Sequence, residues 1–265
     1  VEIKVRGKYR RKAAEIPPLK LKFGKKSLKA EGLDTLNEIK LVLPVFDNAE
    51  GDELLLREYV AYRMYEYLTP ASVRARLIRL TIRDTHVEKS KRTVYAILME
   101  HEEETAVRLK GTEVEAYGLP LDSMITNQVA LVSMFQYMIG NTDWDIPMQR
   151  NVRLIRSNET GKILVVPYDF DFSGFVAAPY ASPSTESGLR TVLDRYLMSN
   201  GVKPEALRRA TQSLKQSRKG LEALCKGKLI SKNSSMHMLN YLDSFFDQID
   251  EKDLVPQTMR VSLMD

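Results

Sequence analysis

Residues 139–151 read IGNTDWDIPMQRN, and residues 167–174 read PYDFDFSG. Each stretch carries two aspartates that are separated by a single residue. The residues between the stretches predict a β-hairpin with Gly161 in its turn, so the two stretches should lie close together at its base. Carboxylate and amide oxygens are the ligands that hard divalent cations prefer. The two stretches therefore predict a site that could hold such a cation.

The hydrophobic pattern before these stretches predicts strands and one helix. From Asp52 to Leu68 the apolar positions fall three and four residues apart, which predicts an amphipathic helix that Pro70 ends. Period-two alternation or short apolar runs predict strands over 1–5, 19–23, 39–46, 74–84 and 92–104. We interpret the acidic run HEEE (101–104) as a solvated strand end, because the second histidine of a metalloprotease motif is missing.

The pattern from residue 121 onward is mainly helical. We expect helices over 121–139, 188–199, 204–219 and 232–249. Strands with one helix come first, and helices with one hairpin follow, which predicts an α+β protein with two lobes. We expect a small β-rich N-terminal lobe over 1–110 and a larger, mainly helical C-terminal lobe over 111–265, with a cleft between them.

Composition limits the chemistry. The chain is 43% hydrophobic and 28% charged, as globular proteins are, and no run approaches the ~20 apolar residues of a membrane span. With one cysteine and three histidines, any metal should be oxygen-ligated, such as Mg²⁺ or Mn²⁺; we expect Cys225 to be a small buried hydrophobe. The net charge of +5 suits phosphate-bearing ligands, but no nucleic-acid recognition motif accompanies it, so we expect no nucleic-acid partner. We expect a soluble protein and see no signal peptide, but a chain that starts at Val1 does not indicate the compartment.

The order of polar residues along the chain matches the requirements of phosphoryl transfer. That chemistry uses carboxylate and amide ligands for Mg²⁺, an aspartate that orients the attacking hydroxyl, and a lysine that grips the phosphates and is held by a helical glutamate. The candidates appear in the order Lys20 or Lys22 on a strand, Glu58 on a helix, Asp143, Asp145 and Asn151 in the first stretch, and Asp169 and Asp171 in the second.

These motifs resemble the CotH-type atypical protein kinases, a family named for a spore coat protein kinase and distantly similar in layout to HipA-like and secretory-pathway kinases. The family shows GN-x-D…N after a helix, which reads Gly140-Asn141-Thr142-Asp143…Asn151 here. It also shows a P-[WY]-D-x-D-x-[ST]-x-G-like element after a hairpin, here Pro167 to Gly174. PPLKLKF, LLREYVAYRMYEYL and VYAILMEHEEE resemble its lysine-bearing strand, its glutamate-bearing helix and a strand that ends in a glutamate, here Glu100.

The resemblance implies a two-lobed, protein-kinase-like fold that binds ATP and Mg²⁺ or Mn²⁺ between its lobes and phosphorylates a protein hydroxyl. It implies that Asp143 is the base, that Asn151, Asp169 and Asp171 lie at the metal, and that Lys20 or Lys22 with Glu58 or Glu100 places the phosphates. In such kinases the asparagine follows the catalytic aspartate by about five residues. Here it lies eight after Asp143 and six after Asp145, so Asp145 is a second candidate for the base.

Other interpretations remain open from the sequence. Asp143 and Asp145 could only cap a turn before Pro147, since aspartate is a common turn residue. The chain could be a pseudokinase or interaction module that binds a partner without catalysis. It could also be a metal-dependent phosphoesterase or nuclease that uses the same carboxylates.

Overall fold

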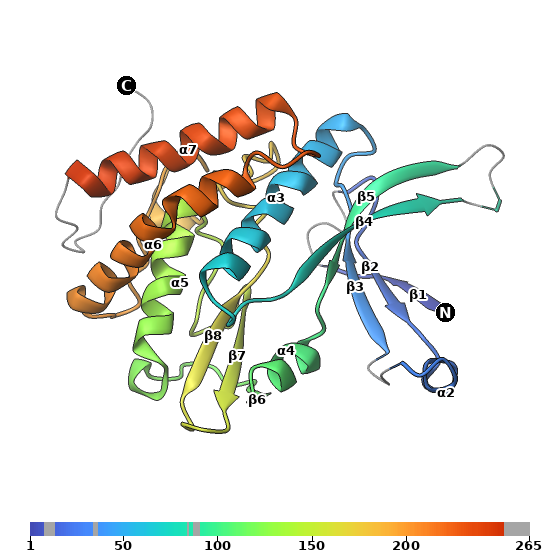
Figure 1. The fold of residues 1–265 in the computed structure, drawn as a ribbon, viewed down its shortest axis with the longest axis horizontal. Coiled ribbons are helices and arrows are strands. Elements are labelled where there is room, and N and C mark those ends of the chain that lie inside the picture. Colours follow the sequence, from blue (N-terminus) through green and yellow to red (C-terminus); the bar gives the residue numbers. More distant parts are fainter. Residues whose placement is uncertain (8–13, 34–36, 84, 87–90, 252–265) are drawn as a thin grey trace.

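The computed structural model describes residues 1–7, 14–33, 37–83, 85–86 and 91–251. Over these residues the protein is a mixed α+β structure with six α-helices and two antiparallel sheets (Figure 1). The α+β class expected from the sequence is confirmed. The basic stretch RGKYRRK (6–12), which follows the first predicted strand, falls mostly outside the described residues.

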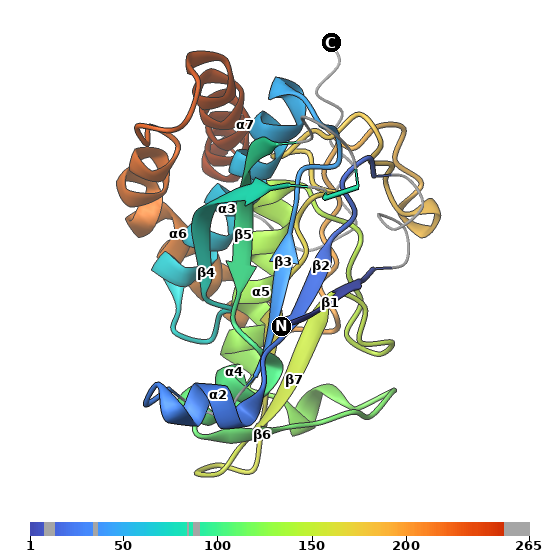
Figure 2. The ribbon, with the colours of Figure 1, turned by 90° about the vertical axis from the view of Figure 1, so that its right-hand side faces the viewer.

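The first sheet has five antiparallel strands in the order β1-β2-β3-β5-β4 (Figure 2). Its strands are β1 (Glu2–Val5), β2 (Leu19–Lys22), β3 (Glu38–Val42), β4 (Ala75–Ile82) and β5 (Arg92–Met99). Lys4, Lys20 and Lys40 stand opposite one another across β1, β2 and β3, so their side chains share one face. The next position on this face in β3 is Val42, which belongs to the main hydrophobic core. This charged row therefore leads from the edge of the sheet toward the core.

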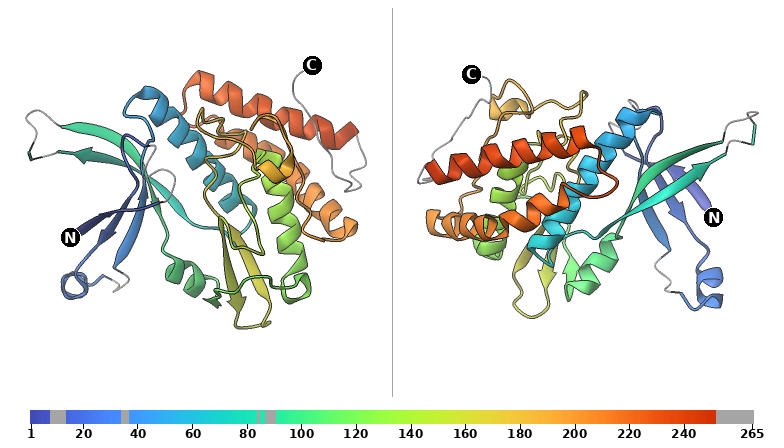
Figure 3. Two further views of the ribbon diagram at one scale, coloured as in Figure 1. Left: turned by 180° about the vertical axis from the view of Figure 1, so that it is seen from behind. Right: turned by 45° about the horizontal axis from the view of Figure 1, so that its top comes forward.

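Helix α3 (Ala49–Leu68) packs against strands β4 and β5 of this sheet on one side and against α6 (Pro204–Leu224) and α7 (Lys232–Glu251) on the other (Figures 1 and 3). Asn48 caps its first turn by accepting a hydrogen bond from Gly51 N. The negative charges of Glu50 and Asp52 in this turn stabilise the helix, because they lie at the positive end of its dipole. The helix ends just before Pro70, as predicted. Because α3 contacts both the sheet and the helices, it connects the two halves of the molecule.

The second sheet has the order β6-β7-β8 and lies beside α5 (Thr126–Ile139). The predicted hairpin is present as β7 (Val152–Ser157) and β8 (Ile163–Pro167), and β6 (Gly111–Glu113), which the sequence pattern missed, adds a third strand. Gly161 has a φ of +67° in the hairpin turn. Gly140 ends α5 in the left-handed conformation.

The N-terminal half contains more helix than the single one we expected. The short α2 (Lys25–Ala30) follows β2, and α4 (Glu102–Arg108) follows β5. The expectation that HEEE is a strand end is therefore wrong. His101 caps α4 by accepting from Glu103 N, and Glu104 accepts from His101 N, so the three glutamates form the favourable first turn of a helix.

The helix expected over 188–199 is absent, because tertiary contacts override its propensity. Arg195 is 1% exposed and donates to Met138 O and Ser244 Oγ and, in a short contact, to Tyr241 O. Asp194 accepts hydrogen bonds from the N–H groups of Arg190 and Thr191. The segment between β8 and α6 instead winds across the rear of the molecule near α5 (Figure 3).

One hydrophobic core joins the parts we assigned to residues 1–110 and 111–265. It runs from Val42 and Tyr62 through Phe135 on α5 to Phe245 on α7. Cys225 is fully buried in it, as expected, and burial raises the pKa of its thiol to about 12. In the described part of the chain, we find no helix that is long and apolar enough to cross a membrane.

Candidate functional site

The two Asp-x-Asp stretches lie side by side, as the hairpin predicted. Gly174 N donates to Gly140 O, and Phe175 N donates to Ile139 O at 3.0 Å. Asn141 and Ser173 form a β-bridge between the same segments. The base of the site is therefore fixed by backbone hydrogen bonds at the end of α5.

A closed turn absorbs the extra residues between Asp143 and Asn151. Asp145 and Arg150 exchange backbone hydrogen bonds in both directions, and Asp145 Oδ1 accepts from Met148 N at 2.6 Å. Asn151 consequently returns to Asp143, and its Nδ2 donates to Asp143 O at 2.7 Å and to Asp143 Oδ2 at 3.0 Å. The Asp145 carboxylate thus closes the turn, whereas the Asp143 carboxylate contacts Asn151.

The surroundings of Asp143 favour its neutral form more than water does. Burial raises the pKa of its carboxyl group, and the negative charge of Asp171 raises it further. The charge of Arg150, whose Nε lies 3.6 Å from Asp143 Oδ1, and the hydrogen bond from Asn151 act in the opposite direction. The influence of Asp171 places it in the electrostatic environment of Asp143. A carboxyl group with a raised pKa is better suited to accept a proton from a hydroxyl.

Two residues of the candidate site have unusual backbone conformations. Asn151 has a φ of +53° and Asp169 has a φ of +64°, a left-handed conformation that is uncommon for non-glycine residues and in which asparagine and aspartate are the most frequent of them. The N–H group of Asp169 donates to Tyr62 Oη of α3 at 2.8 Å, which helps to hold this residue in its conformation. Strained residues that the surrounding structure holds in place cluster at functional sites.

Asp171 and the aromatic residue before it are anchored in the interior. Asp171 is 4% exposed, and Tyr180 Oη donates to its Oδ2 at 3.2 Å. Phe170 is fully buried, with its ring 4.8 Å from that of Tyr62 on α3 and 5.6 Å from that of Phe135 on α5. The second Asp-x-Asp stretch is therefore held between the two helices that flank it.

Lys20 and Lys22, two residues apart on β2, point to the same side of the strand, and both contact Glu38. Lys20 Nζ lies 2.7 Å from Glu38 Oε2, and Lys22 Nζ lies 3.2 Å from Glu38 Oε1. The two lysines hold the pKa of Glu38 down at about 2. Their side chains are 33% and 47% exposed, so both lie toward the outer part of the sheet.

Lys40 on β3 is a lysine that the sequence analysis missed. Its side chain is only 23% exposed and contacts the Glu102 carboxylate. Burial, with the charges of Arg153 and Arg6, lowers the pKa of Lys40 to about 8. Lys40 was overlooked because it lies within the apolar run of 39–46, although period-two alternation places it on the same face as the buried Val42.

Arg153 on β7 lies beside Lys40 and is buried from water. It is 5% exposed, donates to Glu100 O and to Thr105 Oγ1, and lies 5.3 Å from the centre of the Tyr168 ring. The nearest carboxylate oxygen that we find in the described chain belongs to Glu102, at 3.9 Å. Burial lowers the pKa of Arg153, because water cannot solvate its charged form there. Arg153, Lys40 and Arg6 together form what we call the cation cluster.

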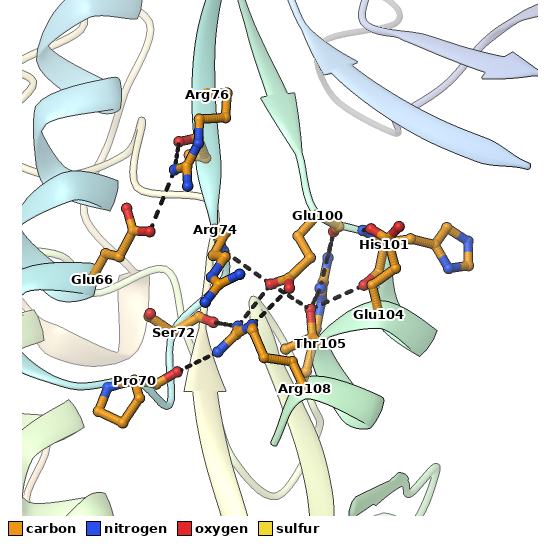
Figure 4. Close-up of polar contacts among 12 residues, drawn as sticks. Glu66, Pro70, Ser72, Arg74, Arg76, Glu100, His101, Glu104, Thr105 and Arg108 are labelled. Atoms are coloured by element: carbon orange, nitrogen blue, oxygen red, sulfur yellow. Dashed lines mark hydrogen bonds and ion pairs between the residues drawn. The ribbon is translucent and has the colours of Figure 1, made fainter. Parts of the chain in front are cut away.

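Glu58 is 1% exposed on α3, so its side chain does not lie on a solvated face of the helix. Glu100 lies at the end of β5, where its carboxylate accepts two hydrogen bonds of 2.7 Å from Arg108 (Figure 4). Burial acts to raise the pKa of Glu100, but the hydrogen bonds from Arg108 and from Arg74 N keep it below its usual value. Arg108 also donates to Pro70 O and Ser72 O, so Glu100 ties α4 to the chain after α3.

The candidate site contains carboxylate and amide oxygen atoms, which are the types of ligand that hard divalent cations prefer. Within the described residues, no three histidine, cysteine, aspartate or glutamate side chains are grouped closely enough to form a metal site. Asn151, whose amide nitrogen is used by Asp143, can offer an amide oxygen in addition to the carboxylates of Asp143 and Asp171. No protein-family model matches the chain, and no curated protein matches it either.

Proposed function

We propose that this protein is an atypical kinase of the CotH type, which binds ATP with Mg²⁺ or Mn²⁺ and transfers the γ-phosphoryl group to a hydroxyl on a protein substrate. The observation that carries the proposal is the contact between Asn151 and Asp143 across an eight-residue separation. A turn that only capped itself would need Asp145, but it would not need Asn151 to return to Asp143 in a strained conformation.

The cation cluster supports the phosphate-binding part of the proposal. The charge of Arg153 lowers the pKa of Lys40, and a phosphate between the two cations would relieve this repulsion. Lys40 also stands on the third strand, where protein kinases place their phosphate-binding lysine. We therefore propose Lys40 and Arg153, in preference to Lys20 and Lys22, as the residues that grip the phosphates.

The metal-binding part of the proposal rests on the charges of the carboxylates. Asp171 raises the pKa of Asp143, so a divalent cation nearby would stabilise both ionised groups. Asn151, Asp169 and Asp171 would hold Mg²⁺, which neutralises the phosphate oxygens during transfer. Asp143 would orient the acceptor hydroxyl and take up its proton during transfer.

The experiment compares Asp143→Asn with Asp145→Asn, which change the same chemical group two residues apart. ATP hydrolysis and transfer of labelled phosphate to a protein hydroxyl, including hydroxyls of this chain, are measured with Mg²⁺ and with Mn²⁺. We expect Asp143→Asn to lower kcat by about 10²–10⁴-fold, as loss of a general base does. Asp145→Asn should retain most activity, because its carboxylate accepts from Met148 N and closes a turn.

Three other results would replace the proposal. If ATP with Mg²⁺ raises the Tm but no phosphate is transferred, the protein is a pseudokinase that binds nucleotide. Hydrolysis of a model phosphodiester that depends on Asp169 would indicate a phosphoesterase. No Tm shift with any pair of nucleotide and metal would reject nucleotide binding and the kinase assignment with it.

A further inference from the structure

We propose that the outer edge of strand β1, which pairs with no other strand among the described residues, pairs with the β1 edge of a second copy of this chain. This pairing joins two five-stranded sheets into one continuous sheet across a two-fold axis. This inference concerns assembly and does not depend on the proposed kinase function.

The outer edge of β1 offers backbone groups for such pairing. Arg6 N donates to Pro18 O, so at even positions the N–H and C=O groups of this strand point toward β2. Phe23 N donates to Asn37 O, so the backbone N–H and C=O groups at odd positions of β2 point toward β3. The backbone groups of Lys20 and Lys22, at even positions, therefore point toward β1, which agrees with the first observation. The N–H and C=O groups of Ile3 and Val5 consequently point away from the sheet. Among the described residues, β1 is the last strand on this side.

The side chains of β1 leave an apolar surface exposed. Ile3 is 63% exposed and Val5 is 50% exposed, and Val1 beside them is 78% exposed. Ile3 stands opposite Leu21, which stands opposite Ile39, so these residues continue the same face into the sheet. An exposed apolar edge strand is a site for strand addition.

The sequence of β1 is complementary to itself when it runs antiparallel. If the two-fold axis passes through Ile3, Ile3 meets the same residue of the second copy, and Val1 meets Val5. Glu2 then stands opposite Lys4 at both ends of the contact, and opposite charges at such positions stabilise a strand pair. The directions of the backbone groups agree with this register. The N–H and C=O groups of Ile3 and Val5 point outward, so these two residues occupy the hydrogen-bonded positions of the new strand pair. Glu2 and Lys4 occupy the non-bonded positions, where side chains come closest.

The other edge of the sheet does not have this property. Strand β4 is also a terminal strand, and its charged residues, Arg76 and Arg79, are both basic. An antiparallel pair of β4 strands therefore has no opposite charges to align. Charge complementarity selects β1 as the self-pairing edge and a second copy as its partner. Because the same patch meets itself, the contact closes as a dimer.

The test is a charge-swap experiment by sedimentation velocity over a range of protein concentrations. A short edge contact buries little area, so we expect a dimer Kd on the order of 10–100 μM for the unchanged chain. Glu2→Lys places lysine opposite lysine and Lys4→Glu places glutamate opposite glutamate, so each variant alone should weaken the dimer by about tenfold or more. An equimolar mixture of the two variants restores both opposite-charge pairs and should form a heterodimer with close to the original Kd.

Glu159→Lys is the matched control, because Glu159 is 71% exposed and pairs with Lys110 far from β1. It makes the same charge change and should leave the Kd unaltered. The proposal fails if the unchanged chain stays monomeric to about 1 mM, well above the Kd expected of so small a contact. It also fails if the single variants dimerise as well as the unchanged chain, or if the mixture does not recover affinity. Equal Tm values for all variants would show that the changes act on association and not on folding.

Discussion

The two Asp-x-Asp stretches and the charged row on the first sheet both collect polar side chains, but they are fixed in different ways. The stretches are joined by backbone hydrogen bonds and rest on the buried ring of Phe170. The row is set by strand register, and each of its lysines also contacts a carboxylate: Lys4 that of Glu2, Lys20 that of Glu38 and Lys40 that of Glu102. The lysines become less exposed from the edge inward: Lys4 at 60%, Lys20 at 33% and Lys40 at 23%. Local sequence motifs therefore predict where the two stretches meet, because backbone hydrogen bonds between them fix their positions. Which of several similar lysines is least exposed depends instead on the strand register of the sheet.

The largest expected effect tests the backbone-fixed region. Gly140 and Gly161 both have positive φ, but a Cβ on Gly140 would lie 1.9 Å from Tyr241 Oη, whereas a Cβ on Gly161 would meet nothing within 4 Å. We expect Gly140→Ala to lower the free energy of unfolding by about 3 kcal/mol, because it adds overpacking to backbone strain. Gly161→Ala should cost only about 1 kcal/mol. Urea denaturation of both variants measures this difference, and equal losses would show that the base of the site is not tightly packed.

The next effect tests whether the least exposed lysine of the charged row, Lys40, binds the nucleotide more strongly than Lys20 does. Lys40→Met should weaken binding of ATP with Mg²⁺ by about 10–100-fold, the value of a charge-assisted hydrogen bond. Lys20→Met should weaken it by less than about threefold, because the side chain of Lys20 is more exposed to water than that of Lys40. Isothermal titration calorimetry gives both Kd values. If Lys20→Met has the larger effect, the sequence-based choice of lysine was right and our proposal for Lys40 is wrong.

The pH dependence of binding sharpens the same distinction. Lys40 has a pKa of about 8, lowered from an ordinary value of 10.5, so it loses its charge as the pH rises through about 8. Nucleotide affinity should fall by up to about tenfold from pH 7.5 to 9, and the fall should vanish in Lys40→Met. Whereas nucleotide affinity should fall as the pH rises, the stability of the unliganded protein should change in the opposite direction. Between about pH 8 and 10.5 the unfolded chain holds more protons at this residue, so the contribution of Lys40 to the stability of the unliganded protein increases with pH.

The smallest expected effect concerns α4, whose first residue, Glu102, contacts Lys40 through its carboxylate. His101→Ala removes the side-chain acceptor of the capping box and should cost about 1 kcal/mol. Glu103→Gln leaves the box intact and should cost only a few tenths of a kcal/mol through the helix dipole. Thermal denaturation of the two variants checks this order. Equal stabilities would show that the cap contributes nothing at this position.

Several features were predictable because they depend on residues that are close in sequence. The hairpin between the two stretches follows from alternation and from Gly161, and α3 follows from its apolar spacing and from Pro70. The proximity of Asp143 and Asp171 followed from that hairpin in turn. The sequence alone thus determined the α+β class and the meeting of the two Asp-x-Asp stretches, since short-range hydrogen bonding and hydrophobic periodicity govern both.

Tertiary structure decided what depends on distant partners. The turn closed by Asp145 assigns this residue a structural contact and returns Asn151 to Asp143, and no spacing rule anticipated it. Arg195 is drawn into contacts with α5 and α7, which replaces the expected helix over 188–199. Lys40 is buried beside Arg153 only because β3 occupies the middle of the sheet. Burial and charge proximity arise from packing between segments far apart in the chain, so only the folded structure can show which lysine and which aspartate occupy the site.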